Sequence, residues 1–206
     1  KEEGEKAYEV LETYKGTDLE YKAYEPLFAC AGEAAAKQKK KAHFVTCDNY
    51  VTMSDGTGIV HIAPTFGADD AKVAKDANIP ALYLINKKGE TRPMVDLQGK
   101  FYLIEDLDAN FVNACVNKEA YAHHAGDYVK NAYDPQFNVD GVWDKKASDK
   151  AEDLNIVLCY ELKQEGKAFK SEKHVHNYPH CWRTDKPILY YPLDSWFIKD
   201  TACKER

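Results

Sequence analysis

Short stretches of alternating apolar and polar residues predict two β-hairpins. Residues 43–53 and 58–64 alternate in this way, and Ser54-Asp55-Gly56 between them is a hairpin signal, because glycine tolerates the positive φ of such turns. Residues 81–86 and 91–95 repeat the pattern on either side of the sequence KKGE. The two pairs of strands are therefore expected to be antiparallel.

Other segments predict less regular structure. In residues 8–28 apolar and polar side chains alternate, with a break at Gly16, and this pattern predicts two short strands. Residues 30–42 are rich in Ala and Lys and suit a loop or a short helix, and the turn-rich residues 134–148 predict a loop. Residues 174–198 combine three prolines with many aromatic side chains, so we expect an ordered, extended segment that packs on another surface.

Helical spacing appears at three places. Residues 69–78 predict a short helix, with Asp69 or Asp70 as the residue that caps its first turn. Residues 149–166 place leucine and valine along one helix and end at Gly166, which suits a C-terminal stop. Residues 107–133 show the spacing in two groups: Phe111, Cys115, Val116 and Tyr121, Ala125, Tyr128. Hairpins and helices without βαβ regularity predict an α+β protein built on an antiparallel or mixed sheet.

Composition narrows the class of protein. The chain has 206 residues, enough for one large domain or a core with an appendage, and 44% hydrophobic residues argue against disorder. No apolar run approaches the ~20 residues of a membrane span, and no signal-peptide pattern is seen. The six cysteines include no C-x-x-C pair, so we expect free thiols and a cytoplasmic location. The sequence begins without methionine, as an excised piece of a longer protein would.

Charge gives a mixed indication about nucleic acids. The net charge of −6 does not favour a general nucleic-acid binder. Residues 37–41, KQKKK, form a local basic run, although such a run taken alone is more typical of a solvated loop or helix face.

The stretch 52–70, TMSDGTGIVHIAPTFGADD, contains the candidate chemistry. A phosphate loop is disfavoured because the residues after Gly56-Thr57-Gly58 predict a strand and not a helix. The glycines would instead let a ligand approach the backbone amides. His61 could be a histidine satisfied within a sheet, and the aspartates could simply be caps. If they line one pocket, a carboxylate could hold an ammonium group and His61 could shape the cavity.

A second cluster, HVHNYPHC over residues 174–181, contains residue types that can bind zinc. His174, His176, His180 and Cys181 are possible ligands, but their spacing matches no common structural zinc site, so we expect no metal. No G-x-S-x-G, Walker or H-E-x-x-H motif is present, and a covalent nucleophile has no support.

Four ordered blocks together resemble the isoleucyl-tRNA synthetase family: GTDLEYKAYEPLF, YVTMSDGTGIVHIAPTFGADD, RPMVDLQGKF and HNYPHCWRTDKPILYYPLDSWFI. They correspond to the family's editing insertion, connective polypeptide 1, and the strands that return to the catalytic domain. The resemblance implies a β-barrel-like α+β class Ia editing domain with peripheral helices over residues 1–173, and a return segment over 174–206.

The resemblance also implies an activity and a set of site residues. The editing domain hydrolyses valine from mischarged tRNA(Ile), and both Asp70 and His61 would belong to the catalytic site. Asp70 would hold the valine α-ammonium, and His61 would form the wall that excludes isoleucine. The turn Gly56-Thr57-Gly58 would lie near the terminal adenosine or the ester. A positioned water would attack, assisted by the neighbouring adenosine hydroxyl, with no side-chain general base assigned.

Because the sequence departs from the family pattern, the chain by itself is expected to edit weakly or not at all. The threonine-rich segment that faces the editing pocket is absent and is expected before Lys1. The ATP-binding signatures HIGH and KMSKS are also absent, so ATP and Mg²⁺ are expected only for the full-length synthetase, and no cofactor for this chain. Where some relatives have Cys-Trp-Arg-Cys, Thr184 follows Arg183, which argues against a zinc site there.

The expected partners are the acceptor end of tRNA(Ile) carrying valine and the rest of the parent enzyme, with no membrane. Two rival interpretations stay open. One is a non-catalytic module that recognises the tRNA acceptor end, and the other is a zinc hydrolase that uses the 174–181 cluster.

Overall fold

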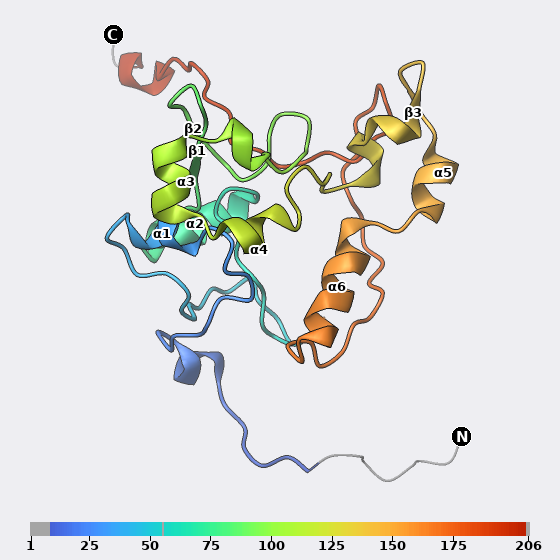
Figure 1. The fold of residues 1–206 in the computed structure, drawn as a ribbon. Coiled ribbons are helices and arrows are strands. Elements are labelled where there is room, and N and C mark those ends of the chain that lie inside the picture. The colour runs from blue at the N-terminus through green and yellow to red at the C-terminus, as the bar shows by residue number, and fades with distance from the viewer. Residues whose placement is uncertain (1–8, 55, 205–206) are drawn as a thin grey trace, which may run out of the picture.

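The computed structural model describes residues 9–54 and 56–204. Figure 1 shows short helices and even shorter strands, which are linked by long irregular connections. The helices are α1 (Gly32–Ala36), α2 (Ala68–Asp76), α3 (Ala109–Cys115), α4 (Lys118–Ala122), α5 (Lys145–Lys150) and α6 (Leu154–Gln164). The strands are β1 (Leu84–Ile85), β2 (Thr91–Arg92), β3 (Asn138–Val139) and β4 (Val142–Trp143). Single turns of 3-10 helix are η1 (Gly16–Leu19), η2 (Ile104–Asp106), η3 (Asn131–Tyr133), η4 (Pro135–Phe137) and η5 (Asp200–Cys203).

The hairpin predicted around KKGE is present. β1 and β2 pair antiparallel, with Leu84 opposite Arg92. The side chain of Asn86 accepts the backbone N–H groups of Lys88 and Glu90, and Gly89 adopts a φ of 76°. The asparagine thus supplies the acceptors that a tight turn needs, and the glycine supplies its left-handed position.

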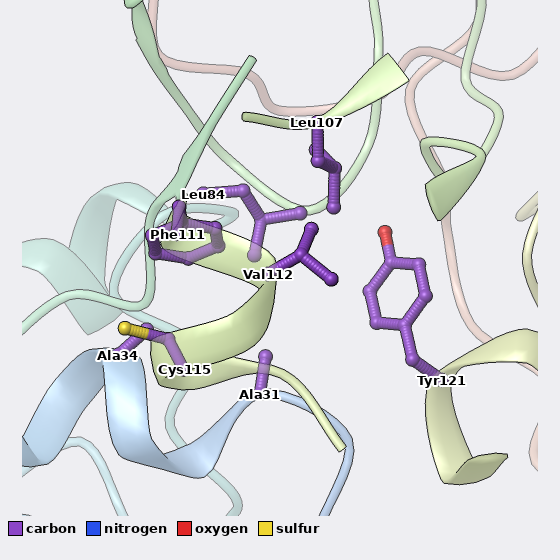
Figure 2. Packing of buried hydrophobic residues seen from close by; sticks show 8 residues of the cluster. All are labelled: Ala31, Ala34, Leu84, Leu107, Phe111, Val112, Cys115 and Tyr121. Carbon is purple, nitrogen blue, oxygen red and sulfur yellow. The ribbon is translucent and has the colours of Figure 1, made fainter. Parts of the chain in front are cut away.

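The core lies where α1, α3 and α4 meet β1 (Figure 2). Leu84 of β1 is completely buried, because its side chain packs against the apolar face of α3. The cluster consists of Ala31, Ala34, Leu84, Leu107, Phe111, Val112, Cys115 and Tyr121. By burying apolar surface, this small set of aliphatic and aromatic side chains joins α1, β1, α3 and α4.

The predicted helical region 107–133 is divided into two helices. Asp108 begins α3 by accepting the backbone N–H of Phe111 at 2.8 Å. The chain turns extended at Val116, and Asn117 begins α4 by accepting the N–H of Ala120 at 3.2 Å. A second capping residue inside the segment therefore restarts the helix in a new direction.

Helix α6 forms within the predicted range 149–166, but it begins only at Leu154, because residues 149–150 are the end of α5. Asp153 caps its first turn, and Gly166 follows its last residues with a φ of 69°. The N–H groups of Gly166 and Lys167 donate to the carbonyls of Lys163 and Leu162, which is the Schellman arrangement. No α6 side chain is fully buried, and Figure 1 shows the helix apart from the α1–α4 core.

The first predicted hairpin is wrong. Phe44 forms a bridge with Ala23 and not with residues 58–64, and the N–H of Tyr21 donates to the carbonyl of Val45. Asp55 of the predicted turn lies outside the described residues. The alternating pattern specified an extended chain, but the pairing partner was taken from another part of the sequence.

Two further predictions need correction. The two strands expected over 8–28 are replaced, in the described residues from 9 onward, by η1 and the single bridge at Ala23, while residue 8 lies outside the described part. The loop expected over 134–148 contains the β3–β4 hairpin and most of α5, which continues to Lys150. Asp140 and Gly141 both have positive φ, as a two-residue hairpin turn requires, and this Asp-Gly pair is a signal that the prediction overlooked.

The C-terminal segment is extended, as predicted. Two tyrosine hydroxyl groups attach it to the rest of the molecule. Tyr191 of the segment donates to the Val95 carbonyl at 2.8 Å, and Tyr133 donates to the carbonyl of Pro187 in the segment at 2.8 Å. Trp196 and Phe197 nevertheless remain exposed. The expectation that this aromatic stretch packs on another surface is thus met only in part within the described chain.

The α+β class is confirmed. Within residues 9–54 and 56–204, the two ladders are each two-stranded and no closed barrel forms, so the barrel-like editing fold stays a prediction. Among the helices described there, none has the length and apolar character to cross a membrane.

Candidate functional site

Asp70 is fixed in place by the segment that precedes α2. Its Oδ2 atom accepts the backbone N–H of Ala63 at 3.0 Å, in partly buried surroundings. A turn in which the N–H of Phe66 donates to the carbonyl of Ala63 folds the chain back at this point. The extended residues that carry His61 therefore end beside the first turn of α2.

Gly67 makes this approach possible. A Cβ atom at position 67 would lie 2.9 Å from Oδ2 of Asp70 and 3.0 Å from its Cγ atom. The φ of Gly67 is −156°, which any residue can adopt, so the requirement for glycine is steric and not conformational. The glycine of GADD thus leaves room for the carboxylate that follows it.

The predicted aspartate cap is wrong. α2 begins at Ala68 with Gly67 as its N-cap, and no side chain accepts a capping hydrogen bond. Asp69 and Asp70 instead occupy the first helical turn, where negative charge interacts favourably with the helix dipole. Because Asp70 is not used as a cap, its carboxylate can join the helix to Ala63.

His61 lies in extended chain two residues before Ala63, and its side chain is exposed. The predicted strand is not formed there, and the adjacent Ile59 is 74% exposed. The interpretation of His61 as a histidine satisfied inside a sheet is therefore wrong. Its position leaves the imidazole open to a ligand.

The glycine turn is formed but stands apart from the carboxylate. Gly56 and Gly58 have φ values of 72° and 75°, and the Thr57 hydroxyl donates to the Ile59 carbonyl at 3.4 Å. The Met53 side chain lies across Gly58, where a Cβ atom would meet its sulfur. Among the described residues, no hydrogen bond connects this turn to Asp70.

Tyr50 is a neighbour of the site that the sequence did not reveal. Burial raises the pKa of its hydroxyl, and the negative charges of Asp70, Asp48 and Asp69 raise it further. The phenol therefore lies within the electrostatic field of the paired aspartates. An isolated tyrosine in a loop carries no sequence signal for such a position.

The 174–181 histidines do not converge on Cys181. The rings of His174 and His176 stack at 5.4 Å, and Nδ1 of His180 hydrogen-bonds the Tyr178 carbonyl at 2.8 Å. Cys181 instead takes hydrogen bonds from the Thr184 side chain and from the Arg183 and Thr184 backbone, which lower the pKa of its thiol. The geometry gives no support to the zinc-hydrolase interpretation.

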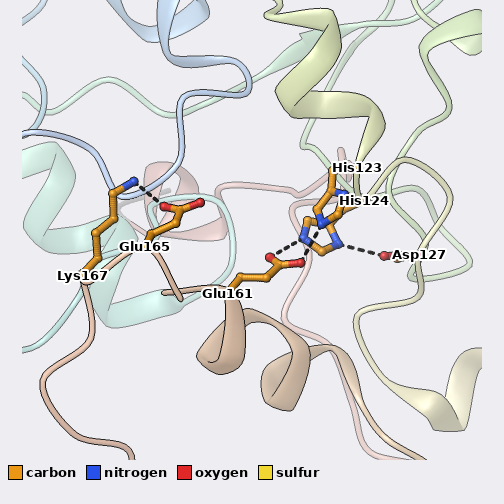
Figure 3. Close-up of polar contacts among 6 residues, drawn as sticks. All are labelled: His123, His124, Asp127, Glu161, Glu165 and Lys167. Carbon is orange, nitrogen blue, oxygen red and sulfur yellow. Dashed lines mark hydrogen bonds and ion pairs between the residues drawn. The ribbon is translucent and has the colours of Figure 1, made fainter. Parts of the chain in front are cut away.

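A different histidine cluster is assembled around Glu161 of α6 (Figure 3). His123 Nε2 lies 2.7 Å from Glu161 Oε1, and His124 Nε2 lies 3.0 Å from Oε2. Burial lowers the pKa of His124, but hydrogen bonds to Asp127 and Glu161 outweigh burial, so this pKa is raised overall. Desolvation raises the pKa of Glu161, whereas its bonds to His124 and His123 lower it, with a net decrease.

Two shallow hollows of about 190 and 340 Å³ lie elsewhere on the surface. Asp127, Asn131 and Asp153 are among the residues that line the first, and Glu33 and Asn117 are among those that line the second. Neither includes His61 or Asp70. Of the two candidate residues, His61 is exposed and Asp70 is partly buried.

Comparison with known proteins gives a consistent result, although no family model matches the chain. It is 57% identical over 205 residues to the isoleucine–tRNA ligase of Bacteroides thetaiotaomicron, covering 97% of this chain and 18% of that protein. It is 49% identical over 200 residues to the Porphyromonas gingivalis enzyme, covering 96% and 16%. The Clostridium acetobutylicum enzyme is 37% identical over 204 residues, covering 99% and 14%.

The chain is thus homologous to a segment of a ligase. The ligases that it matches are isoleucine–tRNA ligases, and this match confirms the resemblance drawn from the four sequence blocks. The chain spans less than a fifth of the length of these curated relatives.

Proposed function

We propose that this chain is the editing segment of an isoleucine–tRNA ligase and that, within the longer enzyme, it hydrolyses valine from mischarged tRNA(Ile). The observation that carries the proposal is the anchored carboxylate of Asp70, held by Ala63 at the end of the segment that contains His61. Homology to a segment of isoleucine–tRNA ligases supports the assignment. The location would be cytoplasmic, with residues 1–173 as the editing domain and 174–206 as the return segment.

The need for such a segment follows from binding energies. A hydrophobic synthetic site distinguishes isoleucine from valine by one methylene, which is worth only about 1–3 kcal/mol. A second site that admits the smaller amino acid can remove valine after transfer to the tRNA. Selection by size and destruction of the wrong product are then separate steps.

Asp70 would recognise the amino group of the misplaced valine. Its Oδ2 atom is oriented by the Ala63 N–H, so Oδ1 is the oxygen that would accept a charge-assisted hydrogen bond from the α-ammonium. Asp69 on the same turn would add negative potential. An oriented carboxylate fixes where the ester carbonyl lies, which is the main requirement for attack by water.

His61 and the glycine turn would complete the site. The exposed imidazole of His61 would form the wall that limits side-chain size, and Gly56-Thr57-Gly58 would approach the terminal adenosine. Water would attack the ester carbonyl, and the bond to the ribose oxygen would break with help from the neighbouring hydroxyl. No metal or cofactor enters this step, and ATP and Mg²⁺ would serve only the complete ligase.

The second candidate is a non-catalytic module that recognises the tRNA acceptor end. The lysine run favours it, but Lys37 donates to the Ala114 carbonyl at 2.8 Å and Lys41 to the Tyr21 carbonyl at 3.2 Å. All four lysines of the run are exposed, but Lys37 and Lys41 make these contacts, so Lys39 and Lys40 would be the residues of the run that meet phosphate.

Hydrolysis of valyl-tRNA(Ile) separates these candidates. The chain, and a longer chain that includes the upstream threonine-rich segment of the ligase, would each be compared with their Asp70→Ala and Asp69→Ala variants. Editing predicts that the longer chain deacylates, that Asp70→Ala abolishes the activity, and that the neighbouring Asp69→Ala retains most of it. A folded longer chain that binds tRNA but does not deacylate would overturn the editing proposal in favour of recognition.

A further inference from the structure

Two segments distant in sequence bring three metal-ligating side chains together. His123 is the C-cap of α4, His124 follows it, and Glu161 projects from α6. One potential ligand atom from each lies within 4.8 Å of the other two. The two imidazole rings are in edge-to-face contact with centroids 4.6 Å apart, so both present Nε2 toward the same carboxylate.

Asp127 orients the central histidine. Its Oδ2 atom lies 2.9 Å from Nδ1 of His124, on the opposite side of the ring from Glu161. This is the carboxylate–histidine pair that commonly supports a metal ligand, because it keeps the proton on Nδ1 and directs the Nε2 lone pair to the metal. Figure 3 shows His124 between the two acids.

We propose that His123 Nε2, His124 Nε2 and the Glu161 carboxylate form a binding site for a borderline divalent cation such as Zn²⁺. Two imidazoles and a carboxylate are a ligand set that zinc accepts, with water in the remaining position. The cation would replace the hydrogen bonds that now bridge the three side chains. The side chain of His123 is 65% exposed, so the ion can reach the site without opening the fold.

The site is independent of the proposed editing function and of the 174–181 cluster. It would serve the architecture, because it connects the end of α4, whose Tyr121 is in the core, to a helix with no fully buried side chain. An ion coordinated by residues at the end of α4 and by Glu161 of α6 would hold α6 against the core more firmly than the present hydrogen bonds do.

The test uses the 206-residue chain kept reduced and freed of metal by a chelator. Titration with ZnCl₂ in a calorimeter gives the dissociation constant and stoichiometry, and Co²⁺ absorption reports the ligand type. The variants are Glu161→Gln, His124→Ala and Asp127→Asn, each checked for folding by circular dichroism. His176→Ala is the control, because it removes an exposed histidine outside the cluster.

The proposal predicts one Zn²⁺ per chain and a Co²⁺ spectrum without a thiolate charge-transfer band. His124→Ala and Glu161→Gln should abolish this saturable binding, and His176→Ala should leave it unchanged. Asp127→Asn should weaken it by about 10- to 100-fold, the usual effect of losing a supporting acid. Saturable binding retained in folded His124→Ala, a thiolate band, or no saturable binding by the unmodified chain would each overturn the proposal.

Discussion

The carboxylate of Asp70 accepts the backbone N–H of Ala63 at 3.0 Å, so a residue in the first turn of α2 holds the end of the segment that carries His61. A local turn and one side chain thus create the candidate site without a sheet. Hydrogen bonds from a neutral donor to a charged acceptor contribute about 1.5–3 kcal/mol. The arrangement can therefore persist although the neighbouring residues 59–61 are exposed.

We expect Gly67→Ala to displace Asp70. The added methyl group would lie 2.9 Å from Oδ2, so the carboxylate must move and its bond to Ala63 must lengthen. Loss of this hydrogen bond costs about 1–3 kcal/mol, measurable as a lower free energy of unfolding in urea. In the longer, editing-competent chain, valyl-tRNA(Ile) hydrolysis should fall in parallel.

Gly32→Ala is the matched control for this substitution. No atom lies within 4 Å of a Cβ at Gly32, and the residue begins α1, so alanine there should be neutral or stabilising by up to about 1 kcal/mol. Equal unfolding free energies for the Gly67→Ala and Gly32→Ala variants would show that Gly67 is not needed for its closeness to Asp70.

The sequence predicted those elements whose ends are determined locally. The β1–β2 turn is set by Asn86 and Gly89, and α6 by Asp153 and Gly166, so short patterns were sufficient. The hairpin over 43–64 failed because alternation specifies which side chains share a face and not which segment supplies the partner. Phe44 found that partner at Ala23.

The candidate sites were predictable to different degrees. Asp70 and His61 were chosen from a continuous motif, and the structure joins Asp70 to Ala63, two residues after His61, through a bond between residues seven positions apart. The contact of His124 with Glu161 spans 37 positions, and no local pattern connects the two. The cluster forms only because the chain brings Glu161 of α6 to the end of α4.

Gly166→Ala should destabilise α6 through the backbone alone. Gly166 has a φ of 69° and nothing within 4 Å of its Cβ position, so a methyl group meets no atom but makes the left-handed conformation unfavourable by about 1 kcal/mol. Because α6 has no fully buried side chain, the loss should appear as faster amide exchange in α6 while the core amides are unchanged. Unchanged α6 exchange would contradict this, and Gly16→Ala, also without close neighbours but outside the left-handed region, is the control.

The Cys181 thiol should react faster at neutral pH than the thiol of Cys30. The Thr184 side chain and the Arg183 and Thr184 backbone lower the pKa of Cys181, whereas burial raises the pKa of Cys30. A thiol with a lowered pKa has more thiolate at any pH below the ordinary value of about 8.5, and thiolate is the reactive form. Iodoacetamide labelling followed by peptide mass spectrometry, as a function of pH, measures both residues in one sample.

Thr184→Val tests the cause of this difference. Without the Thr184 hydroxyl, the Cys181 pKa should rise, and its labelling curve should shift to higher pH while that of Cys30 stays in place. The difference in labelling rate should disappear well above the ordinary thiol pKa of about 8.5, where both forms of the chain are thiolate. A labelling curve for Cys181 that does not move in Thr184→Val would rule out the hydroxyl as the stabilising donor.

Tyr191→Phe should loosen the C-terminal segment, because it removes one of the tyrosine hydroxyl bonds that attach this segment to the rest of the chain. The Tyr191 hydroxyl donates to the Val95 carbonyl at 2.8 Å, and burial together with nearby charges raises its pKa to about 12. Removing the hydroxyl leaves the partly buried carbonyl without this donor, at a cost of about 0.5–1.5 kcal/mol in unfolding free energy. The ring stays and retains its edge contact with Phe66, so packing is largely preserved.

Tyr190→Phe is the control, because it alters an exposed neighbour and should change stability by less than about 0.5 kcal/mol. Limited proteolysis should therefore cut residues 192–204 sooner in Tyr191→Phe than in Tyr190→Phe, and equal rates would show that the Val95 contact does not hold the segment.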